Sequence, residues 1–320
     1  MLKNLILLLL GFLFLVKGAD FFVDGAASIA KRLRIPSLVI GLTIVAFGTS
    51  APELAVSVTA ALKNSNDIAI GNVVGSNMFN LLVVIGMSAM IWPLHVKESI
   101  IKKDYPLSLL AVLLLGFLSM DQLFRGADDM TLGRMDGIIL LIAFAVFMVL
   151  TVMEGLKGRQ ESLAGEEEIE VKYSAVMSIV VSIIGLAGIV VGGDLTVNSA
   201  KEIARAFGLS EALIGLTIVA LGTSLPELVT SIVAAKKGES DISLGNVVGS
   251  NIFNIFLILG TSAAISPMTV TNTYMYDIGL LLLATVVVFI PIVVTKKVGR
   301  GVGTAMVASY IAYTVYLIMR

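Results

Sequence analysis

The sequence predicts an all-α membrane protein with about ten transmembrane helices in two inverted five-helix repeats, with broken helices at the midplane. Hydrophobic residues make up 57% of the 320 residues and charged residues 14%. The mean hydropathy is +0.99, a value that a water-exposed fold could not accommodate. The segment Gly41–Asn80 recurs as Gly215–Asn254. Proline and glutamate interrupt both copies, which predicts the breaks.

Apolar stretches long enough to span a bilayer recur along the whole chain, since one span needs about 20 residues. We expect spans near residues 4–30, 37–62, 67–92, 105–120, 134–154, 174–204, 211–236, 241–266, 275–295 and 302–319. The first is interpreted as a membrane helix rather than a signal peptide, because the apolar run continues past Gly18 without a small-residue cleavage pattern.

Three parts follow from this layout: a first half at 1–155, an acidic connector at 156–172 and a second half at 173–320. The connector is predicted to be a solvated link, too short for a folded regulatory domain. Lys and Arg are about twice as frequent in the loops on one side of the membrane as in those on the other. This bias predicts a protein of the cell (plasma) membrane with both termini outside and the connector in the cytoplasm. The net charge of −1 argues against a nucleic-acid partner. We expect lipid around the chain and no obligatory protein partner.

The two copies of the repeat align without gaps, and about two thirds of their positions match. Each half then holds five spans, an odd number, so the second half must enter the membrane in the opposite direction. The halves would be related by a pseudo-two-fold axis in the membrane plane, which is typical of secondary transporters. This symmetry predicts that the two GTSxPE segments face each other near the midplane.

Each GTSxPE segment places a proline inside an apolar helix. Pro52 and Pro226 cannot donate to the helix ladder, so each helix should kink or unwind there. The break should free carbonyls just upstream, such as those of Ala46 and Ala220. Irregular backbone at this depth is tolerated only where it is buried in protein or faces a wet cavity.

Hydroxyl and carboxyl groups adjoin each break: Thr49, Ser50 and Glu53, and again Thr223, Ser224 and Glu227. A proline-kinked helix whose hydroxyls bond back to their own carbonyls would explain the threonines and serines. It does not explain the glutamates, because a carboxylate in mid-membrane costs about 2.5–3.5 kcal/mol and two facing carboxylates repel. A bound cation would offset both costs.

The GNVVGSN segments carry two kinds of signal. Glycines four residues apart allow close helix packing: Gly71 and Gly75, Gly245 and Gly249. Serine and asparagine at i and i+4 share one helix face and could join a ligand shell: Ser76 and Asn80, Ser250 and Asn254. The other asparagines could instead satisfy the broken backbone of the neighbouring helix: Asn72, Asn77, Asn246 and Asn251.

All of these candidate ligand atoms are oxygen, and oxygen-only sites select hard cations. Ca²⁺ takes about 6–8 oxygens in irregular geometry, whereas Mg²⁺ dehydrates reluctantly. Na⁺ could use the same oxygens. The chain has no cysteine and one histidine, which excludes a Cys- or His-based zinc site. That histidine, His95, is predicted to be a solvated loop residue.

At these residues the sequence resembles the calcium/cation antiporter superfamily, in particular its prokaryotic-type Na⁺/Ca²⁺ exchangers with paired GTSxPE and GNxxGSN segments. The resemblance implies alternating-access exchange of Ca²⁺ for Na⁺, with Glu53 and Glu227 as the central calcium ligands. Thr49 and Thr223 would join them through hydroxyl or backbone oxygen, and Asn80 and Asn254 would face the centre. Flanking sodium sites would be lined by Ser50, Ser76, Ser224, Ser250 and the carbonyls of Ala46 and Ala220.

Asn254 departs from part of that family, because some members, including the potassium-dependent branch, carry Asp at this position. The resemblance therefore implies K⁺-independent exchange and leaves two carboxylates at the centre. The Ca²⁺/H⁺ branch shows GNxxE in place of GTSxPE. The regulatory calcium-binding domains of animal exchangers have no counterpart in the short connector.

Three other functions stay open on the residues alone. A Ca²⁺/H⁺ antiporter would exchange protons instead of sodium at the two glutamates. An ion channel could line its pore with charged rings, although broken helices in inverted repeats favour a carrier. An intramembrane protease would need a histidine base, an HExxH pair or paired aspartates in its spans, and the sequence offers none in a suitable setting. We expect a transporter rather than an enzyme, with no cofactor.

Overall fold

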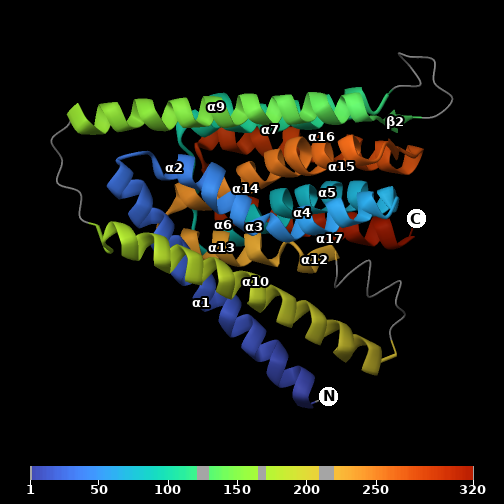
Figure 1. The fold of residues 1–320 in the computed structure, drawn as a ribbon, viewed down its shortest axis with the longest axis horizontal. Coiled ribbons are helices and arrows are strands. Elements are labelled where there is room, and N and C mark those ends of the chain that lie inside the picture. The colour runs from blue at the N-terminus through green and yellow to red at the C-terminus, as the bar shows by residue number, and fades with distance from the viewer. Residues whose placement is uncertain (1, 121–129, 165–170, 209–219, 320) are drawn as a thin grey trace.

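The computed structural model describes residues 2–120, 130–164, 171–208 and 220–319, which are helical almost throughout (Figure 1). The first half contains α1 (Leu2–Leu33), α2 (Ser37–Ile40), η1 (Gly41–Val45), α3 (Ala46–Thr49), α4 (Ala51–Leu62), α5 (Asn66–Phe79), η2 (Asn80–Val84), α6 (Ile85–Ile91), η3 (Ile100–Asp104), α7 (Tyr105–Leu118) and α9 (Arg134–Ala164). The second half contains α10 (Ala175–Ala206), α12 (Ala220–Gly222), α13 (Leu225–Lys236), α14 (Ser240–Phe253), η5 (Asn254–Leu259), α15 (Gly260–Ile265), α16 (Asn272–Thr295) and α17 (Arg300–Met319). The η segments are π-helices.

These helices confirm a helical membrane protein. Within the described ranges, seven helices are long and apolar enough to cross a bilayer, and the bent pair Ser37–Thr49 and Ala51–Leu62 makes an eighth. The predicted span 105–120 coincides with the shorter α7, and the predicted span 211–236 begins at residues outside the described ranges. Large apolar side chains are exposed along α1, α9, α10, α16 and α17, as expected for surfaces that face lipid.

The predicted connector is partly helical. Helix α9 continues to Ala164, so the first residues of the 156–172 segment extend the fifth helix of the first half. Residues 165–170 lie outside the described ranges. The described first part of this segment is thus a helix extension.

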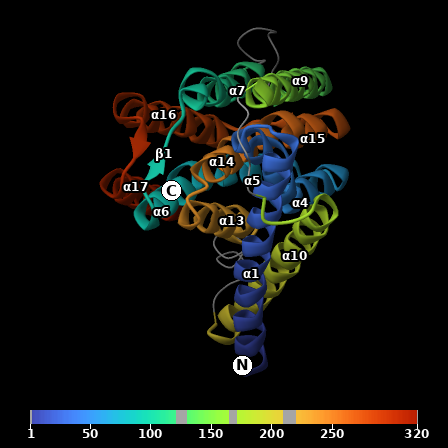
Figure 2. The same cartoon turned by 90° about the vertical axis from the view of Figure 1, so that its left-hand side faces the viewer.

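Helices α1 and α10 lie antiparallel against each other along one side of the molecule (Figures 1 and 2). Glycines permit their close approach. A Cβ added at Gly18 would lie 2.6 Å from the backbone nitrogen of Ile189, and one added at Gly185 would lie 2.4 Å from that of Phe22. The pair rests on the remaining helices largely through α1, which packs along α13.

The interior is formed by α5 and α14, which carry the two GNVVGSN segments, and every residue of α14 from Ile242 to Phe253 is buried. The segment α2–α3 crosses α14 closely. A Cβ added at Gly245 would lie 2.9 Å from the carbonyl oxygen of Leu38, and one added at Gly249 would lie 2.8 Å from the Cβ of Ala46. The small-residue packing predicted for this second copy is confirmed. The segment that would pack on the first copy lies mostly outside the described residues.

Equivalent helices of the two repeats run in opposite directions, as inversion requires. In Figure 1 the chain runs from left to right through α2, α3 and α4, but from right to left through α12 and α13. It likewise runs from right to left through α5 and α6, but from left to right through α14 and α15. The gapless sequence repeat and these opposed directions support the inverted arrangement.

The turns gather at two opposite ends of the helices, here called face A and face B. Face A carries the turns 34–36, 92–99, 171–174, 237–239 and 296–299, and face B carries the turns 63–65, 130–133 and 266–271. On face A, β1 (Leu94–His95) pairs with β4 (Lys297–Val298). On face B, β2 (Thr131–Leu132) pairs with β3 (Met268–Thr269). Turns predicted to share a side of the membrane therefore contact each other.

Candidate cation site

The two GTSxPE segments do not merely kink a helix; each begins a new one. Pro52 and Pro226 lie in the first turn of α4 and α13, where proline is tolerated because its missing N–H would have no partner. The residues just before these helices, Ser50 and Ser224, leave helical geometry with ψ near 6°. In the first repeat the two helix pieces are bent by 50°. The predicted breaks are confirmed.

Glu53 and Glu227 are the third residues of these new helices, and both side chains are 0% exposed. The first turn of a helix carries the positive end of the helix dipole, which favours a carboxylate. The breaks thus place two negative charges inside the protein at positions where the local backbone stabilises them.

Each carboxylate reaches the break of the opposite repeat. Ser50 Oγ lies 2.9 Å from Glu227 Oε1 and 3.0 Å from Ser250 Oγ. In the mirror arrangement, Ser224 Oγ lies 3.0 Å from Glu53 Oε1 and 3.1 Å from Ser76 Oγ. These matched contacts bring six of the predicted site residues into one buried cluster, and they confirm that the two breaks face each other.

Several polar atoms of the cluster have no hydrogen-bond partner in the protein. They are Glu53 Oε2, Glu227 Oε2, Asn254 Oδ1, and both Oδ1 and Nδ2 of Asn80, and all four side chains are 0% exposed. A buried oxygen without a partner costs about 1–3 kcal/mol, and more when it is charged. Four of these five atoms are oxygens, so a hard cation would satisfy them. Within the described residues no group of three or more His, Cys, Asp or Glu could hold a metal, which fits a centre with two carboxylates.

The helices that carry the two central asparagines widen at those residues. The π-helix η2 begins at Asn80, and η5 begins at Asn254. A π-helical turn loosens the regular i→i+4 ladder and is frequent at functional sites. The coincidence in both repeats ties this widening to the cluster, and no sequence pattern had predicted it.

The predicted release of the Ala46 carbonyl is wrong. This oxygen accepts a hydrogen bond from the Ser50 amide at 3.0 Å and lies 3.4 Å from Thr49 Oγ1. The helix breaks after the hydrogen bond from Ser50 to Ala46 has formed. Pro52 has no N–H, so the donor that is missing is the one that would have bonded to the carbonyl of Gly48. A carbonyl keeps a second lone pair, so a ligand role for Ala46 stays a prediction. Ala220 begins α12, and its role as a ligand also stays a prediction.

Two asparagines of the GNVVGSN segments bond to the broken helices, which confirms the alternative reading of those residues. Asn72 Nδ2 donates to Ser57 Oγ at 3.0 Å and to the Glu53 carbonyl at 3.4 Å. Asn246 Nδ2 donates to Ser231 Oγ at 2.9 Å and to the Glu227 carbonyl at 3.4 Å. Sequence reasoning missed these two serines, although both follow their glutamate by four residues and so share its helix face.

The oxygens of the same two asparagines accept from the threonines of the opposite repeat. Thr49 Oγ1 donates to Asn246 Oδ1 at 2.9 Å, and Thr223 Oγ1 donates to Asn72 Oδ1 at 3.4 Å. The other pair of asparagines joins α5 to α14: Asn77 Nδ2 donates to the Asn251 carbonyl at 3.2 Å. A shell of amides therefore surrounds the carboxylates and links the repeats.

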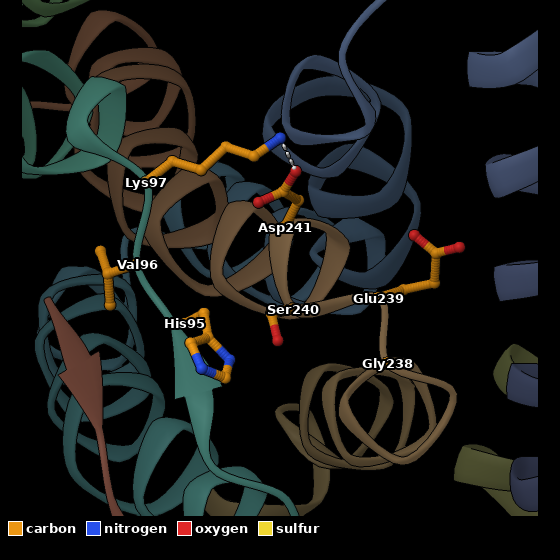
Figure 3. A pocket seen from close by; sticks show the side chains of 7 residues that line it. All are labelled: His95, Val96, Lys97, Gly238, Glu239, Ser240 and Asp241. Atoms are coloured by element: carbon orange, nitrogen blue, oxygen red, sulfur yellow. Dashed lines mark ion pairs between the residues drawn. The ribbon is translucent and has the colours of Figure 1, made fainter.

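A surface cavity lies on face A, away from this cluster (Figure 3). Its volume is about 300 Å³, and it is lined by His95, Val96, Lys97, Gly238, Glu239, Ser240 and Asp241. Lys97 Nζ pairs with Asp241 at 2.5 Å, and burial raises the pKa of Glu239. His95 is exposed, as predicted, but it lies in the short strand β1 rather than in a loop. The chemistry of a cation site belongs to the buried cluster rather than to this surface cavity.

Known proteins are similar to this chain in sequence and in fold. A sequence model of the family described as sodium/calcium exchanger protein matches residues 3–153 and 177–319. The putative antiporter CaxA of Alkalimonas amylolytica is 42% identical over 275 residues, covering 83% of this chain and 82% of that protein. The sodium/calcium exchanger MaX1 of Methanosarcina acetivorans is 35% identical, covering 98% of each chain. A structure of the sodium-calcium exchanger NCX_Mj soaked with zero Na⁺ and Ca²⁺ matches with a TM-score of 0.82 and 35% identity over 98% of each chain.

Proposed function

The chain belongs to the sodium/calcium exchanger family, and from this premise we propose that it is a secondary-active antiporter that exchanges Ca²⁺ for Na⁺ by alternating access. The observation that carries the proposal is the buried pair of glutamates between the two helix breaks, each with one oxygen that lacks a partner. The relative MaX1 is named a sodium/calcium exchanger, which points in the same direction.

The proposed chemistry is competition for the same oxygens. Glu53 and Glu227 supply two negative charges that one Ca²⁺ neutralises, and neighbouring hydroxyls supply neutral ligands for the 6–8 oxygens that this ion takes. Na⁺ is a hard cation of similar size and would occupy the flanking hydroxyls and carbonyls. In this scheme Thr49 and Thr223 complete the calcium shell, and Asn80 and Asn254 face it. Sodium would bind near Ser50, Ser76, Ser224, Ser250 and the carbonyls of Ala46 and Ala220.

The orientation in the membrane is part of the proposal. Lys and Arg cluster in the turns of face A, so we assign face A to the cytoplasm and both termini to the outside of a plasma membrane. The 156–172 segment then lies in the cytoplasm. The protein is proposed to work without a cofactor, to catalyse no chemical reaction, and to need no obligatory protein partner.

Two features of the site concern ion specificity. The centre holds asparagine at both 80 and 254, so no third carboxylate is available, and we assign a K⁺-independent exchange. A Ca²⁺/H⁺ antiporter is the alternative, because two buried carboxylates could carry protons between turnovers. The two mechanisms differ in which gradient drives calcium uptake.

The test uses purified protein in liposomes loaded with Na⁺ and placed in a choline medium containing radioactive Ca²⁺. We expect calcium uptake that depends on the outward Na⁺ gradient, persists with a protonophore present, and is unaffected by K⁺. Liposomes loaded with choline instead of Na⁺ provide the control. Uptake that survives this replacement but collapses with the protonophore would establish the proton-coupled alternative instead.

A further inference from the structure

The hydroxyl of Thr49 can bind a cation only if its proton points away from that cation. A hydroxyl has one proton and two lone pairs, and a cation can be approached only through a lone pair. The proton therefore has to point at an acceptor on the side away from the cation. The hydroxyl lies 2.9 Å from Asn246 Oδ1, closer than the helix carbonyls of Val45 at 3.2 Å and Ala46 at 3.4 Å.

The orientation of the Asn246 amide is fixed by its other partners. Its Nδ2 lies 2.9 Å from Ser231 Oγ and 3.4 Å from the Glu227 carbonyl. A carbonyl can only accept, so the amide nitrogen has to be on that side. The oxygen is consequently held toward Thr49, and the side chain is 0% exposed. No solvent competes for this bond.

The same arrangement occurs in the other repeat with looser geometry. Asn72 Nδ2 is held by Ser57 Oγ at 3.0 Å and the Glu53 carbonyl at 3.4 Å, and its Oδ1 lies 3.4 Å from Thr223 Oγ1. The threonine bond is thus 2.9 Å in one copy and 3.4 Å in the other. A contact made twice by independent parts of the sequence is more than a packing accident.

We infer that Asn246 and Asn72 are positioning residues that take up the threonine proton and so turn the lone pairs of Thr49 and Thr223 toward the transported cation. Each asparagine is anchored to the backbone of the glutamate in its own repeat and acts on the threonine of the opposite repeat. A shift of one glutamate would therefore change the ligand geometry at the other break. This inference rests on the proposed function, since it names the residues that prepare the cation site.

The test compares the Ca²⁺ concentration for half-maximal uptake with the maximal rate. Asn246→Leu removes the acceptor at similar volume, and Ser231→Ala removes only the amide's other partner. We expect Asn246→Leu to raise the half-maximal Ca²⁺ concentration about tenfold, the effect of one lost hydrogen bond at a ligand, with the maximal rate changed less than about threefold. Ser231→Ala should raise it less than about threefold, and Asn72→Leu less than Asn246→Leu.

A double-mutant cycle separates positioning from a structural role. If Asn246 acts through the threonine hydroxyl, Asn246→Leu should have little further effect in a Thr49→Val background, and Thr49→Ser should keep near-normal affinity. Additive effects in the cycle, or equal effects of Asn246→Leu and Ser231→Ala, would overturn the inference. Thr49→Val with unchanged affinity would also overturn it, because the ligand would then be the backbone oxygen.

A second measurement keeps this inference distinct from the proposed function. Ca²⁺-dependent protection against thermal unfolding of the detergent-purified protein reports binding without transport. If liposomes with wild-type protein show no Na⁺-driven uptake while Ca²⁺ still protects the protein, the exchange proposal fails. The double-mutant cycle is then evaluated from the Ca²⁺ concentrations that protect each variant. If Ca²⁺ protects wild type and Asn246→Leu at the same concentration, the positioning inference fails.

Discussion

Lys63 and Lys237 occupy equivalent positions in the two repeats, directly after α4 and α13, but their surroundings differ. Lys237 Nζ contacts three oxygens of α1: Asp20 Oδ1 at 2.6 Å, Asp24 Oδ1 at 2.6 Å and the Asp20 carbonyl at 2.8 Å. All three donors of the ammonium group are thus used. Among the side chains that the structure describes, Lys63 has no ion-pair partner.

The helix residues opposite these lysines show the same difference. Asp194 of α10 aligns with Asp20 of α1, yet it accepts from its neighbour Asn198 at 2.9 Å instead of from a lysine. Helix α1 packs along α13, and no comparable packing joins α10 to α4 in the described residues. The α1–α10 pair is therefore attached to the rest of the molecule on face A.

The centre of the molecule shows the opposite behaviour, because the contacts of Ser50 and Ser224 differ by only about 0.1 Å between the repeats. The repeats are thus alike in the serine contacts of the two glutamates and unlike where the α1–α10 pair is held. In alternating access the ion site opens to one face and then to the other, so contacts formed at one face in one state are replaced by contacts at the other face in the other state. The ion pairs of Lys237 differ between the faces, so they can be replaced in this way.

The largest effect is expected where the repeats are alike. Glu53→Gln and Glu227→Gln should each reduce Ca²⁺ uptake about 100-fold or more, because removing one partner of a buried charge interaction costs about 3–5 kcal/mol. Size-exclusion profiles should stay normal, since glutamine keeps the volume and the hydrogen bond from serine. Equal losses in the two variants would support a symmetric centre. Normal transport in either variant would show that the assigned site is wrong.

A smaller effect is expected from a third carboxylate. Asn254→Asp should change the Na⁺ or K⁺ concentration for half-maximal exchange about tenfold. Asn254 Nδ2 donates to Asn77 Oδ1 at 2.9 Å, so aspartate there loses a donor and faces an oxygen, whereas Asn80 has no such bond. The matched variant Asn80→Asp should therefore be tolerated better. Unchanged ion dependence in both variants would argue that these positions are only structural.

The sequence was sufficient to predict the features that the two repeats share, namely the helix breaks and the buried glutamates. The prolines at 52 and 226 and the glutamates three residues after each serine are local signals, and a repeat copies local signals faithfully. Contacts across the repeats, such as that of Asn246 with Thr49, depend on how two halves dock, which no local pattern contains. The same limit applies to Lys237, because an identical lysine at 63 has a different environment.

Removing the ion pairs of Lys237 on face A should have a moderate effect on transport, and the same substitution at the equivalent Lys63 should have almost none. Lys237→Gln should change the half-maximal Ca²⁺ concentration or the rate about three- to tenfold, since it takes the cation away from Asp20 and leaves Asp24 paired with Lys172 alone. Lys63→Gln should change either by less than about twofold. Equal effects of the two variants would contradict the proposed difference between the faces.

Cysteine pairs can test directly whether the two faces exchange roles, because the chain contains no cysteine of its own. The pair Asp24→Cys with Lys237→Cys should cross-link readily in the state described here. The equivalent pair Asn198→Cys with Lys63→Cys should cross-link only when the ion gradient is reversed. Either cross-link should stop transport, and reduction should restore it. Cross-linking of both pairs at the same rate under one gradient would exclude an exchange of attachments.

The smallest effect is expected from another ion-pair centre on face A. Lys102 and Lys296 bond to Glu98 and lower the pKa of its carboxyl to about 2. A lowered pKa means that these pairs are present above the unfolded value near 4.5 and are lost only as the pH falls through about 2. Glu98 therefore stays ionised throughout the range from about pH 5.5 to 8.5 in which transport is measured. Glu98→Gln should leave the pH profile of Ca²⁺ uptake unchanged. A shifted profile would place this exposed carboxylate in the transport cycle and remove the distinction between Lys237 and the other lysines of face A.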